Sequence, residues 1–90
     1  MFKKSPEKLL LEAEKHEARV DHCLHLARDG ASLSIRRENV LPGMQALGEC
    51  FETLGRIDPS NRPSNWNALI QRLDNKHDEF TKLRQELWST

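Results

Sequence analysis

One line of positions in the first third of the chain recurs in steps of mostly three and four residues, the spacing of one face of an α-helix. The line is mainly apolar and comprises Leu9, Ala13, His16, Val20, Cys23, Leu24 and Ala27. Ser5-Pro6-Glu7 precedes it with a hydroxyl cap, a proline at the first helical position and an acid in the first turn. Gly30 comes after it, and glycine readily adopts the left-handed conformation that ends helices. The pattern predicts a helix over about residues 6–28.

The last third carries a second line of the same spacing. Its members are Trp66, Leu69, Ile70, Leu73, His77, Phe80 and Leu87, with Trp88 at the edge. A turn-forming segment rich in proline, serine and asparagine, residues 58–63, precedes it, and Ser64 or Asn65 can cap a helix that starts there. We therefore expect a helix over about residues 65–87. Within it, Arg84 is placed four residues before Trp88, where the two side chains would stack as a cation–π pair.

The middle third keeps a heptad frame that Pro42-Gly43 interrupts. The frame consists of Leu33, Val40, Met44, Leu47, Phe51 and Leu54. An internal proline removes one backbone hydrogen bond and clashes with the preceding turn. Two interpretations are possible: one kinked helix over residues 34–54, or a short helical turn before a helix that begins near Val40. Gly48 and Gly55 either allow a close helix approach or lie on an exposed face.

The three heptad frames fall into step if the chain runs up, down and up with tight connections near Gly30 and Ser60. Antiparallel pairing then predicts core layers of Leu9, Phe51 and Leu69; Ala13, Leu47 and Leu73; Val20, Val40 and Phe80; and Ala27, Leu33 and Leu87. This agreement favours the kinked middle helix. The sequence thus predicts an all-α fold, in which residues 1–90 form a single helical domain. Its architecture is an antiparallel up-down-up three-helix bundle, with the middle helix kinked or split near Pro42.

Charge and cysteine content narrow the classes of function. Fourteen basic and fourteen acidic residues cancel, and the first, middle and last thirds of the chain are each balanced as well. The chain therefore has no basic half that would hold a nucleic-acid backbone. No stretch approaches the roughly 18 apolar residues of a membrane span, and the N-terminus lacks the apolar run of a signal peptide. Cys23 and Cys50 are too few for a disulfide framework. We expect free thiols and a cytoplasmic location.

One predicted layer is unlike its neighbours because it contains His16, Met44 and His77. Imidazole and thioether groups are ligands for transition metals and haem, so a metal- or haem-binding bundle is one alternative. The other is that each histidine makes one hydrogen bond and otherwise fills space. No nucleophile–base arrangement, zinc-finger spacing or Gly-rich phosphate loop is present. We expect neither an enzyme nor a bound metal or cofactor.

The acidic residues of the first predicted helix are scattered rather than clustered. They include Glu12, Glu14, Glu17 and Asp21. Such a distribution indicates a solvated face and not a catalytic pair of carboxylates.

The face of the first helix opposite the core stripe carries a weaker line of uncharged and histidine side chains. It comprises Leu11, Ala18, His22 and His25, with Leu26 at its flank. Such a second line is typical of a helix with a second partner. Our leading hypothesis is a small non-enzymatic protein–protein interaction module of the adaptor, assembly-factor or inhibitor type. We expect it to present helix faces and to form a homodimer through this line.

A nucleic-acid-associated regulator is the alternative from another class. Its contacts would come from Lys3, Lys4, Arg36 and Arg37, since Arg36-Arg37 is the only basic pair in the middle of the chain.

Overall fold

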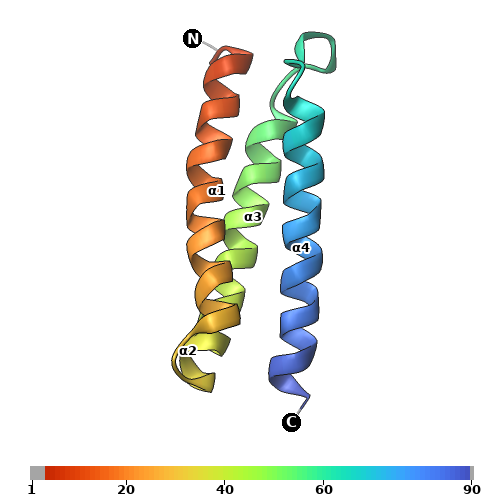
Figure 1. Ribbon diagram of the computed structural model, residues 1–90. Coiled ribbons are helices and arrows are strands. Elements are labelled where there is room, and N and C mark those ends of the chain that lie inside the picture. The colour runs from red at the N-terminus through yellow and green to blue at the C-terminus, as the bar shows by residue number, and fades with distance from the viewer. Residues whose placement is uncertain (1–3, 90) are drawn as a thin grey trace.

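The chain folds into three long antiparallel helices that run side by side, as the computed structural model of residues 4–89 shows (Figure 1). The helices are α1 (Pro6–Asp29), α2 (Leu33–Glu38), α3 (Val40–Gly55) and α4 (Trp66–Trp88), with a 3-10 turn at Pro59–Asn61. α2 and α3 together form the middle helix, bent by 24° where they join. No strand occurs among the described residues. The up-down-up three-helix bundle predicted from the sequence is confirmed.

The start of α1 agrees with the sequence signals, but its end does not. The Ser5 hydroxyl accepts a hydrogen bond from the Lys8 amide at 3.2 Å, and Pro6 is the first helical residue. Gly30 ends the helix with φ at −57°, so the predicted left-handed conformation is wrong. The reason for glycine at this position is steric: a Cβ there would lie 2.5 Å from the Leu26 carbonyl oxygen, so no side chain fits.

The middle helix breaks at Asn39, three residues before Pro42. Pro42 would clash with the carbonyl of Glu38, four residues earlier, if the helix were continuous. Ending α2 at Glu38 and restarting at Val40 instead puts Pro42 in a first turn, where a missing N–H costs little. The Asn39 side-chain amide donates to the Ile35 carbonyl at 2.7 Å and so helps to end α2. The predicted interruption of the middle helix is confirmed.

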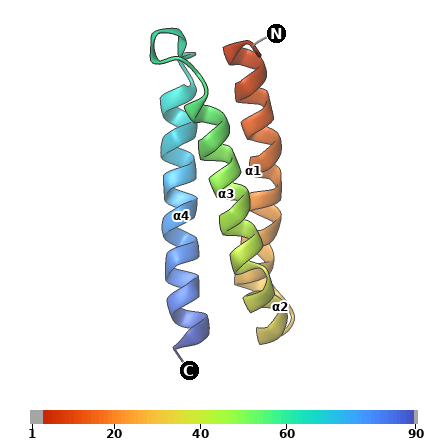
Figure 2. The same cartoon turned by 180° about the vertical axis from the view of Figure 1, so that it is seen from behind.

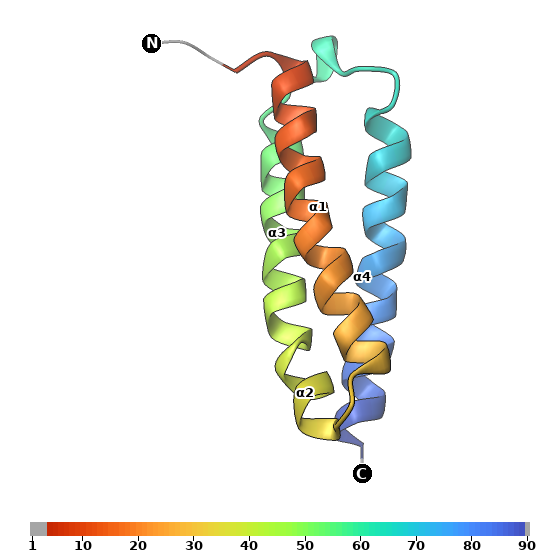
Figure 3. The ribbon, with the colours of Figure 1, turned by 60° about the vertical axis from the view of Figure 1, so that its left-hand side comes forward.

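The core lies along the three inward faces and contains most of the predicted layer residues. Its buried apolar members are Leu9, Leu10, Ala13, Val20, Leu24, Ala27, Val40, Ala46, Leu47, Cys50, Leu54, Ile57, Leu69, Leu73, Phe80, Leu83 and Leu87. The heptad pattern predicts Leu33 in the last layer, but this residue is 45 % exposed. It is the first residue of α2, the segment that bends away from the axis of α3 at the foot of the bundle (Figure 3).

Gly43 of α3 packs directly against the Phe80 ring of α4. A Cβ there would lie 2.3 Å from the Cζ atom of Phe80, so only glycine fits against this ring. Gly48 and Gly55 have no atom within 4 Å of where a Cβ would stand, and both are exposed. The exposed-face interpretation of these two glycines is therefore correct.

An ion-pair network joins α1 to α4. Both Glu17 carboxylate oxygens accept from the Arg72 guanidinium, at 2.6 and 2.7 Å, and Lys76 donates to Glu17 at 2.6 Å. Lys76 also lies 2.7 Å from Asp21. Glu17 is buried, so the prediction that it lies on a solvated face is wrong: the partners that neutralise it come from a helix far away in sequence.

No helix in the described part of the chain is long and apolar enough to cross a membrane.

Candidate docking groove between α3 and α4

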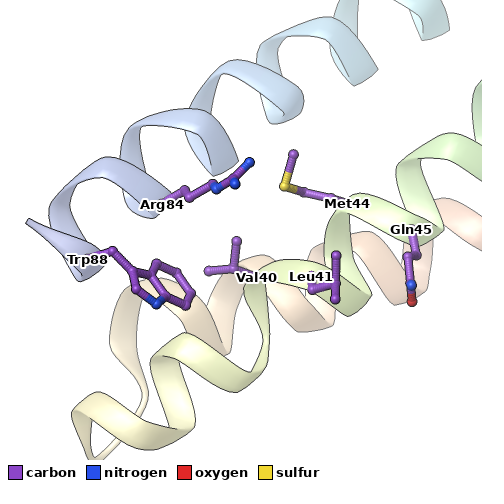
Figure 4. A pocket seen from close by; sticks show the side chains of 6 residues that line it. All are labelled: Val40, Leu41, Met44, Gln45, Arg84 and Trp88. Carbon is purple, nitrogen blue, oxygen red and sulfur yellow. The ribbon is translucent and has the colours of Figure 1, made fainter.

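A groove of about 690 Å³ opens between the start of α3 and the end of α4 (Figure 4). Its lining consists of Val40, Leu41, Met44, Gln45, Arg84 and Trp88. Val40 is buried and Met44 half-buried, whereas Leu41 is 64 % exposed and Trp88 is 53 % exposed. Two large apolar side chains therefore project into solvent beside an apolar floor, an arrangement typical of an interaction surface.

A second hollow of about 500 Å³ continues the groove along the same two helices. It is lined by Met44, Leu47, Gly48, Phe51, Asp74 and His77, so Met44 belongs to both hollows. Gly48 leaves this part open because nothing fills the space where a side chain would stand. Viewed from behind, α3 and α4 run side by side over the length concerned (Figure 2).

Four residues of α4 line the two hollows: Asp74, His77, Arg84 and Trp88. They lie along one line of helical spacing, which Ile70 and Thr81 complete. Asp74 and Arg84 are its acidic and basic members, and neither forms an ion pair with another residue between positions 4 and 89. By contrast, Arg28 and Glu79 pair between α1 and α4 at 2.9 Å. The groove thus offers two unused charges of opposite sign.

The predicted interface residues lie on the outer face of α1, away from the groove. Leu11 is 60 % exposed, Ala18, His22 and His25 are exposed, and Leu26 is half-buried. The His25 imidazole lies 3.6 Å from Asp29. Leu11 is the only large exposed hydrophobic residue on this line, in contrast to the two at the groove.

The predicted layer of His16, Met44 and His77 is not assembled. His77 is exposed and shares the second hollow with Met44, whereas the His16 Nδ1 atom lies 3.1 Å from Glu49. The core line of α4 passes through Leu73 and Phe80, and this rotation leaves His77 outside. Among residues 4–89, no group of three or more histidine, cysteine or acidic side chains is placed to hold a metal.

The basic pair of α2 binds the ends of two neighbouring helices. The Arg36 Nε donates to the Ala27 carbonyl at 3.0 Å, and the Arg37 Nε donates to the Leu87 carbonyl at 2.8 Å. The Arg37 guanidinium also lies 5.7 Å from the centre of the Trp88 ring, the place predicted for Arg84. Both arginines are thus half-buried and hydrogen-bonded to helix ends of the bundle.

The lysines of the nucleic-acid hypothesis add little to it. Lys4 pairs with Glu12 at 2.7 Å, and Lys3 lies outside the described residues. The nucleic-acid hypothesis stays a prediction without support from this geometry.

Both cysteines are free thiols, as expected. The Cys50 thiol donates to the Ala13 carbonyl at 3.5 Å, and burial raises its pKa to about 11. Neither cysteine lines the groove, and a thiol with so high a pKa is a poor nucleophile.

Comparison of the chain with protein-family models, with curated proteins and with solved structures finds no match. The chemistry of its own surface is therefore the basis for a functional assignment.

Proposed function

We propose that this protein is a non-enzymatic protein–protein interaction module whose docking surface is the groove between α3 and α4. The proposal depends on one observation: two large exposed apolar side chains, Leu41 and Trp88, line the same groove, whose floor is apolar. Tryptophan is enriched among the residues that dominate binding energy at protein interfaces. A cytoplasmic location belongs to the same proposal, because both cysteines are free thiols.

The shape of the groove suits a helical partner. Two antiparallel helices form its walls, and the floor from Val40 to Phe51 spans about 17 Å, or three helical turns. An amphipathic helix binds such a groove through residues spaced three and four apart. Its apolar side would cover Leu41 and Trp88, and Gly48 would let its backbone come close.

The outer face of α1 is the second candidate surface for association. It keeps the predicted residues Leu11, Ala18, His22, His25 and Leu26, of which four are exposed. The groove has stronger support, because a pocket and two large apolar side chains coincide there. Leu11 and Leu41 have similar exposure, at 60 % and 64 %, which makes them a matched pair for an experiment.

The experiment compares Leu41→Glu with Leu11→Glu in affinity capture from the cells that make the protein. The tagged parent should retain a defined set of proteins, which includes untagged copies of the chain where it self-associates. Leu41→Glu should lose them, whereas Leu11→Glu should keep them, because a buried unpaired carboxylate is costly only where the surface is covered. Far-ultraviolet circular dichroism checks that both variants fold. Equal capture by the parent and Leu41→Glu would show that the groove is not the docking surface.

A further inference from the structure

The groove-facing line of α4 is complementary to itself when a second copy runs in the opposite direction. Residues equally far from position 79 form three pairs: Ile70 with Trp88, Asp74 with Arg84, and His77 with Thr81. The first pair is apolar, the second has opposite charges and the third can share a hydrogen bond. An antiparallel copy of α4 laid on this line would therefore meet a suitable side chain at each position.

On the groove side of α3, one pair of residues fits the same antiparallel arrangement. It is Leu41 and Gly48, which lie equally far from a point between Met44 and Gln45. Leu41 projects from the surface, with 64 % of its area exposed. Gly48 borders the second hollow and has no atom within 4 Å of where its Cβ would stand. An antiparallel copy of α3 would place its leucine in the space beside this glycine.

The two centres of symmetry lie at about the same height along the bundle. Gly43 packs directly on Phe80; Phe80 is next to the α4 centre, and Gly43 lies within two residues of the α3 centre. A single two-fold axis can therefore satisfy the α4 line and the α3 pair at once. If it lies in the interface and perpendicular to the helices, it sets α3 on α3 and α4 on α4, both antiparallel.

We propose that the occupant of the groove face is a second copy of this chain, docked antiparallel about this axis. The inference rests on the proposed function and names the partner. Leu41 of each copy fills the hollow beside Gly48 of the other, and Arg84 of each pairs with Asp74 of the other. Within the described part of one chain, neither charge has an ion-pair partner. The second copy would supply a partner for each.

The available area is sufficient for a dimer. The line from Ile70 to Trp88 spans about 27 Å. Two packed helices are about 18 Å wide, so the face offers about 500 Å² per copy and about 1,000 Å² in total. This is less than the roughly 1,200–2,000 Å² of stable interfaces and is the size of weak, transient ones. We expect a reversible homodimer rather than an obligate one.

A charge swap tests the pairing of the second copy. Sedimentation equilibrium of the parent at high micromolar concentration should show a dimer. Asp74→Arg and Arg84→Asp should each weaken self-association about tenfold or more, because each puts like charges together. The double variant Asp74→Arg with Arg84→Asp should recover the dimer. A double variant as weak as either single one would overturn the antiparallel pairing.

A second variant fills the hollow without harming the monomer. Gly48→Gln should raise the thermal stability of the helix yet abolish the dimer, because its side chain occupies the space that Leu41 of the second copy needs. Gly55→Gln is the control, an equally open helical glycine one heptad beyond the paired segment. If the two variants dimerise alike, the hollow beside Gly48 is not part of the interface.

The remaining outcomes separate this inference from the proposed function. A parent that is monomeric overturns the second copy as occupant, whereas loss of captured proteins on Leu41→Glu would still support a docking groove for another protein. A dimer that Leu11→Glu with Ala18→Glu abolishes and Gly48→Gln leaves intact would assign self-association to α1 and overturn the inference.

Discussion

At the scale of single residues, Glu17 shows how a charge can be both buried and satisfied. Its carboxylate accepts two hydrogen bonds from Arg72 and one from Lys76, and these groups lie on another helix. The hydrogen bond from Arg72 is the main reason that the pKa of Glu17 lies below its ordinary value of 4.5, with Lys76 acting in the same direction against the effect of burial. Such a contact couples the packing of α1 and α4 to the ionisation of one carboxylate.

Removing that charge should destabilise the fold and flatten its acid dependence. Because the folded pKa is lowered, Glu17 stabilises the fold above its unfolded pKa, and this contribution is lost as pH falls through the folded pKa. We expect Glu17→Gln to cost about 2 kcal/mol at neutral pH, since Arg72 loses its charged partner and Lys76 loses one of its two. Urea unfolding between neutral pH and pH values below about 4 would measure both effects.

Glu14→Gln is the matched control on the same helix, because Glu14 is exposed and forms no ion pair with the residues described. Its unfolding free energy should stay close to that of the parent. Parallel acid dependence of Glu17→Gln and the parent would contradict the role given to the network.

At the scale of elements, α2 acts as a joint that holds two helix ends. Its arginines donate to carbonyls at the last turns of α1 and α4, groups that have no partner within their own helices. The break at Asn39 turns α2 so that these side chains can reach. Arg36 and Arg37 therefore have a structural role that a basic pair in a sequence does not reveal.

Within α3, two glycines should respond oppositely to the same change. Gly43→Ala should destabilise the protein by about 1–3 kcal/mol, because its methyl group would overlap the Phe80 ring and force the helices apart. Gly48→Ala should stabilise the monomer by up to about 1 kcal/mol, since the new methyl group meets nothing and favours the helix. Thermal unfolding of both variants under monomeric conditions is the measurement. Equal shifts of the same sign would be inconsistent with the packing of α3 on α4.

At the scale of the whole molecule, the bundle is long and thin, with extents of 48 × 22 × 16 Å. A chain of 90 residues in this shape buries a limited core. Covering a further apolar face would add to its stability by mass action, because a partner that binds only the folded state favours it.

Truncation of a buried side chain should lower the free energy of unfolding far more than truncation of an exposed one. Leu47→Ala and Phe80→Ala should each cost about 2–5 kcal/mol, because both side chains are among the largest that are fully buried. Leu11→Ala should cost the monomer far less, at 60 % exposure. Urea melts at a concentration where the protein is monomeric make the comparison. A similar loss for all three variants would mean that the faces are wrongly assigned.

Hydrophobic periodicity in the sequence predicts the three helices and most of the core. Hydrophobic periodicity is sufficient for this, because desolvation acts on each side chain separately and repeats with the turn of the helix. Periodicity alone assigns positions such as Val20, Leu47 and Leu73 to the core, and all three are buried. The local chemistry of Pro42 is equally sufficient to predict the interruption of the middle helix.

The groove could not be predicted in the same way. Periodicity marks Trp88 only as an edge residue, and Leu41 lies outside every line that it identifies. The sequence does show that Leu41 and Gly48 are seven residues apart and so lie on the same face of α3. This spacing points to a docking surface only once α3 and α4 are known to leave an open groove beside it.

Which side chains meet depends on how the helices pack against one another. The rotation of α4 leaves His77 outside the core and brings Arg72 and Lys76 to Glu17, and Gly43 packs on Phe80 between α3 and α4. Pairings of this kind depend on the mutual rotation and spacing of helices, which a few side-chain volumes set together. No single helix carries that information, because its own periodicity is the same whatever lies opposite.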